Sequence, residues 1–213
     1  MIKSLLHFNN PNDLTKDEIK GVPWKVVGTV ASSQDGKFGN CLSMTGNGYL
    51  QNNTIDLSLD KEWTLEMWVY ADSYYGSQPV FSISSGESPS SCIHIEGERL
   101  YVAVNNSSRT FSLDFPISQW VHFSLVNSLQ ELYAFVNGIR KVKLSNNQVT
   151  LGGTPEILLG SDRTISTYFR GLVDEFRISD NALWTYDFTP PTHEASMFKY
   201  IFIDKNNTVM GMR

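Results

Sequence analysis

Residues 169–179, near the end of the chain, read Phe-Arg-Gly-Leu-Val-Asp-Glu-Phe-Arg-Ile-Ser. Leu172, Phe176 and Ile178 recur with a period of two, which predicts a strand with these side chains in a core. Val173 places an apolar group on the opposite face, so we expect both faces of the strand to be at least partly covered. The segment therefore predicts a strand inside a layered β structure.

Asp174 lies in the middle of this strand among apolar neighbours. An unpaired carboxylate is costly to desolvate in such surroundings. Either a cation or a set of backbone N–H groups would compensate its charge, and the residues leave both alternatives open.

The length and composition indicate a β-rich domain. A chain of 213 residues suits one large all-β domain or, less readily, two small ones. Only 18% of the residues are charged, while Ser, Asn, Thr and aromatic residues are plentiful, which favours strands and polar loops over helices. The net charge is 17 − 22 = −5 and no basic block occurs, so nucleic-acid binding has no electrostatic support.

Cys41 and Cys92 both lie in strand-like surroundings, which favours two buried free thiols over a disulfide. We see no signal-peptide pattern and no apolar run approaching the ~20 residues of a membrane span. We therefore expect synthesis in the cytoplasm, with any surface location reached by lysis or within a particle.

Short β-prone runs separated by turn signals fill most of the chain. Asn137-Gly138 is the strongest hairpin signal, and Thr45-Gly46-Asn47-Gly48 predicts a second hairpin-like connection. Residues 14–20 could form one short helical turn, but no helical periodicity extends over a dozen residues. The predicted strands are residues 4–8, 24–30, 41–44, 49–51, 63–71, 80–83, 92–95, 99–104, 110–113, 119–126, 131–136, 140–144, 156–160 and 169–179. Their spacing is typical of a β-sandwich or jelly roll.

The order of several segments resembles the concanavalin A-like, laminin-G-like jelly roll of bacteriophage and bacterial surface proteins. The matching segments are residues 5–8, 37–42, 63–69, 119–123, 133–138, 169–179 and 188–191. The resemblance covers about residues 4–192. It implies an all-β, two-sheet antiparallel β-sandwich over residues 1–192, followed by a short C-terminal β-hairpin extension over residues 193–213.

The resemblance also implies a structural calcium ion between the first strand and the late strand that carries the aspartate. Asp174 stands at the position of that aspartate, and Gly46 and Asn47 stand in the connection that usually lends an oxygen ligand. Asn9 replaces the usual aspartate after the first strand, which removes one negative charge from a hard-cation site. Calcium is therefore predicted as a cofactor, and the alternative is that backbone hydrogen bonds alone hold Asp174.

Glycoside hydrolases with this fold carry the pattern Glu-x-Asp-x-x-Glu, which this chain lacks. Glu66 is followed by Trp68 and Tyr70, and neither of these can act as acid or nucleophile. Asp174 and Glu175 are adjacent, so in a regular strand they would face opposite sides. The four histidines show no metal-ligand spacing. We therefore expect no enzyme activity.

Polar loops with aromatic residues are better candidates for ligand binding. One pair is Tyr74 and Tyr75, and a second group is Asp162, Arg163 and Tyr168; a third loop covers residues 85–91. For each loop, a solvated loop without ligand is the alternative. The tryptophans at 24, 63, 68 and 120 have strand-like surroundings and are predicted to lie in the core.

Two classes of function follow from these expectations. The first is a non-enzymatic structural or adhesion module on a phage virion or cell surface, with lectin-like glycan binding. Residues 193–213 would then dock on other virion or surface proteins, or on further copies of the chain. The second is a free calcium-dependent carbohydrate-binding lectin, and an enzyme with an unrecognised site is a more distant third.

Overall fold

The computed structural model describes residues 1–73, 78–85, 91–104, 107–129, 131–145, 151, 154–162, 167–196, 201–203 and 209–212. Within these ranges the chain forms strands, turns and loops without a helix, so it contains no helix that could cross a membrane. The strands are β1 (Ile2–Leu6), β2 (Lys25–Ser33), β3 (Cys41–Asn52), β4 (Trp63–Tyr70), β5 (Pro79–Ser84), β6 (Ser91–Glu96), β7 (Arg99–Val104), β8 (Ser107–Ser112), β9 (Trp120–Asn127), β10 (Glu131–Val136), β11 (Ile139–Ser145), β12 (Glu156–Leu159), β13 (Arg170–Ser179), β14 (Ile201–Ile203) and β15 (Val209–Met212). The predicted all-β class is confirmed.

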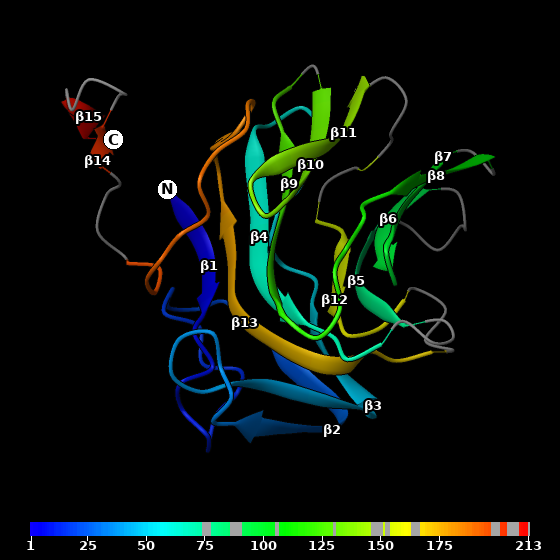
Figure 1. Ribbon diagram of the computed structural model, residues 1–213, viewed down its shortest axis with the longest axis vertical. Helices are drawn as coiled ribbons and strands as arrows, with labels where there is room; N and C mark the ends of the chain where they lie inside the picture. Colours follow the sequence, from blue (N-terminus) through cyan, green and yellow to red (C-terminus); the bar gives the residue numbers. More distant parts are fainter. Residues whose placement is uncertain are drawn as a thin grey trace.

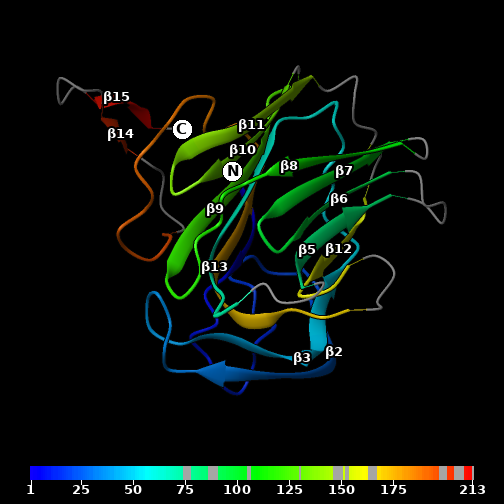
Figure 2. The same cartoon turned by 45° about the vertical axis from the view of Figure 1, so that its right-hand side comes forward.

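One antiparallel sheet of 13 strands curls into two facing layers (Figure 1). The first layer has the order β11-β10-β9-β4-β13, with β1 paired to β13. The second layer holds β12, β5, β6, β7 and β8, which Figure 2 brings forward. These layers form the predicted β-sandwich.

β3 joins the two layers, because its first half pairs with β13 and its last residues pair with β12. Its register with β2 shifts after Thr29, where Thr45 and Gly46 are left without a partner on β2. The hairpin predicted at residues 45–48 is therefore wrong. A β-bulge inserts extra residues and bends the strand without reversing the chain.

The core lies between the layers and is made by alternate side chains of each strand. Its central members are Leu65, Met67 and Val69 of β4, Val121, Phe123 and Leu125 of β9, and Phe81 and Ile83 of β5. The rings of Phe81 and Phe123 meet across the sandwich with 5.7 Å between their centroids. Cys41 and Cys92 are buried free thiols, as predicted.

β13 departs from regular alternation at Glu175. Its register with β4 shifts between Asp174 and Arg177, and Glu175 adopts a φ of +52°. Three of its apolar side chains point into the core: Val173, Phe176 and Ile178. Leu172 is only half-buried, so its predicted place on the core face is wrong by one position, because the bulge adds one residue to the strand. The prediction that both faces are covered is confirmed over residues 173–179.

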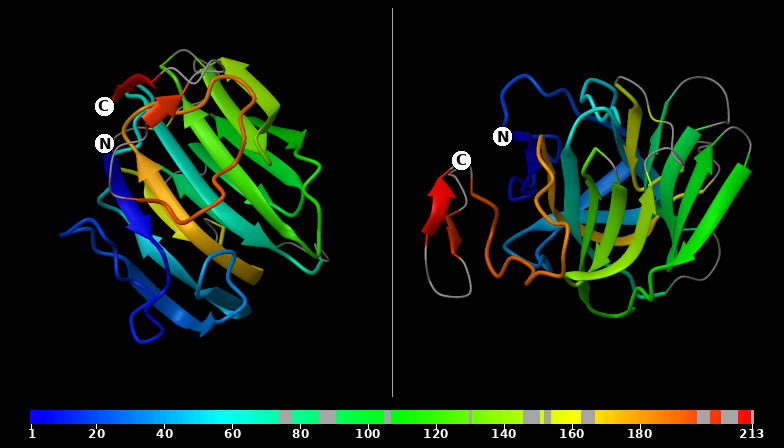
Figure 3. Two further views of the ribbon diagram at one scale, coloured as in Figure 1. Left: turned by 60° about the vertical axis from the view of Figure 1, so that its left-hand side comes forward. Right: turned by 90° about the horizontal axis from the view of Figure 1, so that it is seen from above.

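The segment 181–196 crosses the outer face of β4, β9 and β10 (Figure 3). Trp184 stacks on Phe188 with 4.2 Å between ring centroids, and Phe188 meets Phe135 at 5.4 Å. The backbone N–H of Phe188 donates to the carbonyl of Gly138 in the β10–β11 turn. That turn is the predicted Asn137-Gly138 hairpin, with φ of +50° and +77° at its two residues.

The helical turn predicted over residues 14–20 is wrong, since these residues form non-helical turns. Asp17 Oδ1 accepts the backbone N–H groups of Leu5 at 3.0 Å and of Ile19 at 2.7 Å. Such side-chain bonds to the backbone compete with helix formation.

β14 and β15 pair only with each other among the described residues, and Figure 1 shows them apart from the sandwich. The residues just before them contact the domain. Asn9 Nδ2 donates to Glu194 at 3.0 Å, and the N–H of Ala195 donates to Glu175 at 2.6 Å. The first part of the predicted extension therefore packs on the sandwich.

Candidate functional site

An open cleft of about 730 Å³ lies where β4 ends, β9 begins and β13 begins. It combines aromatic, charged and hydroxyl side chains on strands that are fixed by the sheet. Its lining residues include Tyr70, Asp72, Trp120, Arg170, Asp35 and Ser43. We call it the outer cleft.

Tyr70 and Trp120 form the aromatic part of the outer cleft. They are directly opposite each other in the β4–β9 ladder, with ring centroids 5.8 Å apart and ring planes inclined by 60°. Both side chains point away from the core, because Val69 and Val121, their neighbours along the strands, point into it. Both are half-buried, so each ring keeps an accessible part.

Further along the same face the aromatic groups are covered. Lys37 Nζ lies 4.3 Å from the centroid of the Trp68 ring, which is 7% exposed. His122 meets Trp68 on one side and Phe188 on the other, at 5.2 Å and 5.8 Å. Burial lowers the pKa of His122 to about 3, so this imidazole is neutral. Trp68 and His122 therefore offer little accessible surface, in contrast to the half-buried Tyr70–Trp120 pair.

Charged groups stand around this aromatic pair. The side chains of Arg170 and Asp72 are exposed, and neither side chain forms a hydrogen bond or ion pair with another described residue. Asp35 accepts the hydroxyl of Ser33 at 2.9 Å. The cleft thus presents two carboxylates and one guanidinium, all available to a ligand.

The backbone of Gly46 packs closely against the side chain of Arg170. A Cβ at residue 46 would approach the guanidinium Nε of Arg170 to 2.7 Å, and the φ of Gly46 is +83°. Only glycine readily combines that backbone conformation with such a close approach. The bulge of β3 therefore positions the cation of the cleft.

The residues predicted to bind ligand lie elsewhere or outside the described ranges. Tyr74, Tyr75 and Arg163 fall outside the described residues, as do residues 86–90 of the third loop. Tyr168 stacks on Tyr49 with 6.2 Å between centroids, and neither it nor Asp162 lines the outer cleft.

The prediction that Trp120 lies in the core is wrong. Tryptophans 24, 63 and 68 are buried as predicted, whereas Trp120 lines the outer cleft. The alternation along residues 119–123 could have indicated this position, since Val121 and Phe123 take the core face.

The predicted calcium ligands do not form one set. Asn9 and Asp174 contact the same loop from two sides: Asn9 Oδ1 accepts the N–H of Asn40 and Asp174 Oδ2 that of Phe38, each at 2.9 Å. Gly46 lies four to five residues further along β3 from this point, or about 13–17 Å at strand spacing, and Asn47 follows it. Their predicted contribution to the site with Asp174 is therefore not supported by the fold.

Asp174 is compensated by backbone N–H groups. Besides the bond from Phe38, its Oδ1 accepts the N–H of Glu175 at 2.8 Å. Burial raises the pKa of Asp174 to about 7, and these bonds oppose the rise. A hard cation needs several free oxygen ligands, and no cluster of three or more His, Cys, Asp or Glu in the described ranges could hold a metal. Calcium binding therefore stays a prediction.

The other buried carboxylates of this layer are also paired. Glu66 forms an ion pair with Arg177 and accepts the indole N–H of Trp184 at 3.1 Å. Glu175, turned out of the ladder by its bulge, contacts His7 Nδ1 at 2.5 Å, and this bond raises the pKa of the imidazole. These groups hold β1, β4 and the segment 181–196 on β13.

Comparison with known proteins agrees with this architecture. The family model of the concanavalin A-like lectin/glucanases superfamily matches residues 44–185. A search of curated protein sequences gave no significant match.

Among solved structures, domain 4 of AbnA, a GH43 extracellular arabinanase from Geobacillus stearothermophilus in complex with arabinotriose, has a TM-score of 0.71. It is 22% identical, over 86% of this chain and 94% of that one. The binding domain of botulinum neurotoxin DC in complex with rat synaptotagmin II has a TM-score of 0.63 at 15% identity, over 86% of this chain and 49% of its own. A structure of botulinum neurotoxin type C, whose cell entry depends on two ganglioside molecules, has a TM-score of 0.61 at 16% identity, over 86% and 48%. The chain thus spans about half the length of these neurotoxin chains, and the likeness concerns the fold.

Proposed function

The chain belongs to the concanavalin A-like lectin/glucanase superfamily, and we propose that it is a non-enzymatic glycan-binding module whose binding site is the outer cleft. The observation that carries the proposal is the half-buried, partly accessible Tyr70–Trp120 pair, next to Arg170 and Asp72, whose side chains have no ion pair with any described residue. Ligand sites combine apolar surface with a few polar groups that fix orientation. The rigid β4–β9 ladder supplies the surface, and Arg170 and Asp72 supply the polar groups.

The chemistry of the cleft favours neutral oligosaccharides. The apolar face of a sugar ring can lie on Trp120 or Tyr70, while carboxylates accept hydrogen bonds from its hydroxyls and the guanidinium donates to its oxygens. Two carboxylates against one guanidinium give the cleft a net negative charge. An anionic sugar would be repelled at short range.

Binding can be tested by calorimetry with arabinotriose, the ligand in the similar arabinanase domain, followed by a panel of neutral and acidic oligosaccharides. We expect Trp120→Ala to weaken binding of a neutral sugar by about 30-fold, the usual effect of removing a central aromatic contact. Tyr186→Ala is the matched control, because Tyr186 is 79% exposed and lies outside the cleft. Equal affinity of the Trp120→Ala variant and the parent would refute this site.

We also propose that the module serves adhesion at a virion or cell surface and that it has no catalytic site. The family resemblance supports the adhesion role. The bonds that Glu66, Asp174 and Glu175 form within the protein support the proposed lack of a catalytic site. A bound neutral oligosaccharide should keep its chain length on prolonged incubation with the protein. Chromatographic detection of shortened products would contradict the non-enzymatic assignment. Oligosaccharide binding that persists in the presence of a chelator would show that the module is not a calcium-dependent lectin.

A further inference from the structure

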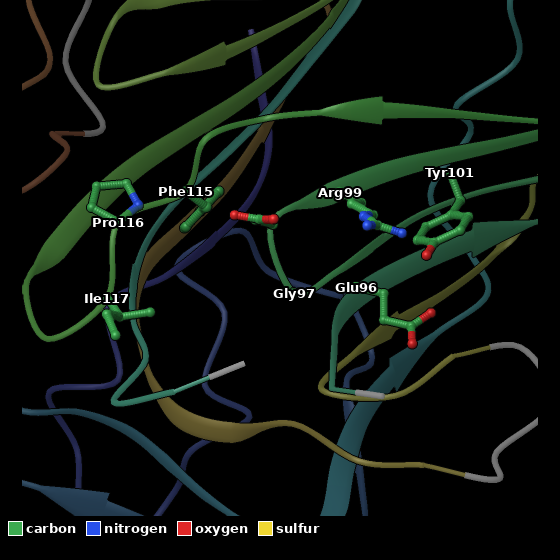
Figure 4. A pocket seen from close by; sticks show the side chains of 8 residues that line it. Glu96, Gly97, Arg99, Tyr101, Phe115, Pro116 and Ile117 are labelled. Atoms are coloured by element: carbon green, nitrogen blue, oxygen red, sulfur yellow. The ribbon is translucent and has the colours of Figure 1, made fainter. Parts of the chain in front are cut away.

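A second hollow of about 600 Å³ lies on the opposite layer, between the β6–β7 hairpin and residues 115–117 (Figure 4). Figure 4 shows Phe115, Pro116 and Ile117 on one side and Glu96, Arg99 and Tyr101 on the other. Glu98, at the tip of the hairpin, completes the polar wall. The outer cleft shares no lining residue with this surface, which we call the hairpin hollow.

The apolar wall of the hairpin hollow is held in place by its flanks. Asp114 and Ser118, on either side of residues 115–117, have φ of +48° and +55°. Left-handed conformations at non-glycine residues are costly and persist only when their surroundings fix them. Here Asp114 bonds Ser112 at 2.9 Å and Lys141 at 3.1 Å, and the N–H of Ser118 donates to Ala71 at 2.7 Å. The wall is therefore rigid although Ile117 is 48% exposed.

The exposed apolar surface of the wall is aliphatic. Phe115 is almost fully buried, which leaves Pro116 and Ile117 to line the opening. Across the hollow, one face of Tyr101 is occupied by the His94 ring, stacked at 4.6 Å. Since one face of Tyr101 is covered and the opposite wall is aliphatic, we consider an extended aliphatic chain a better fit to the hollow than a sugar ring.

The polar wall carries an excess of negative charge. Glu96 and Glu98 oppose a single Arg99. Glu96 lies 3.7 Å from His94 Nε2, whereas Glu98 and Arg99 are exposed without an ion pair among the described residues. The chain as a whole has a net charge of −5, which also attracts cations. An aliphatic wall facing carboxylates matches a lysine side chain, whose methylenes pack on apolar surface while its ammonium stays polar.

We propose that the hairpin hollow binds a lysine-bearing peptide segment of a partner protein. The lysine stem lies along Pro116 and Ile117, and its ammonium meets Glu98 and Glu96. The volume exceeds that of one side chain, so neighbouring backbone of the partner is accommodated as well. This site is independent of the glycan-binding cleft.

The test uses the full chain and two capped peptides, acetyl-Gly-Lys-Gly-amide and acetyl-Gly-norleucine-Gly-amide, which differ in the ammonium group. NMR shift titration up to about 10 mM covers the weak affinity of a short ligand. We expect the lysine peptide to bind about tenfold more tightly and to perturb residues of the β6–β7 hairpin and 115–118. Equal affinity of the peptides, perturbation elsewhere, or no perturbation by the lysine peptide overturns the proposal.

Variants at exposed positions measure the contribution of each wall of the hairpin hollow to peptide binding. Glu98→Gln should weaken lysine-peptide binding about fivefold, since an exposed ion pair contributes up to about 1 kcal/mol. Ile117→Ser should weaken binding of both peptides, whereas Ile139→Ser, at a similarly exposed isoleucine outside the hollow, should leave it unchanged. Trp120→Ala should not alter peptide binding. An unchanged affinity in both Glu98→Gln and Ile117→Ser also overturns the proposal.

Discussion

Replacement of Arg177 by Met should strongly destabilise the fold, because it leaves Glu66 buried without its cation. Arg177 is 1% exposed and Glu66 is 3% exposed, and the two form an ion pair between β13 and β4. Methionine keeps most of the apolar volume, so the main change is the loss of charge.

The magnitude follows from the burial of Glu66. Burial raises the pKa of this carboxyl from 4.5 to about 7. This pKa is that of the carboxyl beside Arg177, and each further pKa unit of rise in the variant corresponds to about 1.4 kcal/mol. Removal of one partner of a buried ion pair generally costs about 3–5 kcal/mol, which is the loss of stability that we expect.

The deficit should also depend on pH. When folding raises the pKa of a carboxyl, the folded state binds its proton more tightly than the unfolded state does. This contribution to stability is fully present below the unfolded pKa and is lost as the pH rises through the folded pKa. For Glu66 in the parent this loss falls between about pH 4.5 and pH 7, and removal of the Arg177 cation should raise the pKa of Glu66 further and extend the loss to higher pH in the variant. The difference between Arg177→Met and the parent should therefore be larger at pH 8 than at pH 5. Taking the difference removes the contribution of Asp174, which is common to both proteins.

Urea unfolding followed by tryptophan fluorescence at pH 5 and pH 8 measures this difference. The double variant Glu66→Gln/Arg177→Met should recover much of the lost stability, because it leaves no buried charge at this position. Lys143→Met breaks the exposed pair with Glu131 and should shift the urea midpoint far less. A midpoint for Arg177→Met that equals the parent at both pH values would refute the reasoning.

Two further predictions concern the predicted calcium ion and the C-terminal hairpin. If calcium binds beside Asp174, the midpoint of thermal unfolding should be higher in calcium than in chelator, and Asp174→Asn should abolish this rise. Equal midpoints would mean that backbone N–H groups alone compensate the charge of Asp174. Truncation after Ser196 removes β14 and β15 but keeps the Glu194 and Ala195 contacts, so it should preserve folding while reducing self-association or partner binding. Light scattering that shows the same oligomeric state, together with unchanged partner binding, would exclude an assembly role for the hairpin.

The outer cleft is made by residues that are far apart in the sequence. Tyr74 and Tyr75, which are neighbours in a polar loop, lie outside the described residues and stay a prediction, whereas Tyr70 and Trp120 are 50 positions apart in the sequence. Only the β4–β9 register places them directly opposite each other. Arg170 reaches the same cleft through a third strand and a bulge in a fourth, which no local pattern encodes.

The sequence by itself determined the all-β class, most strands, the Asn137-Gly138 turn and the free state of the two cysteines. Those features depend on alternation, turn chemistry and composition, which act over a few neighbouring residues. The tertiary structure alone decided the bulges at residues 45–46 and 175, the exposure of Trp120, and the pairing of Glu66 with Arg177. Register between distant strands sets these features, and a shift of one residue moves a side chain from the core to the opposite face.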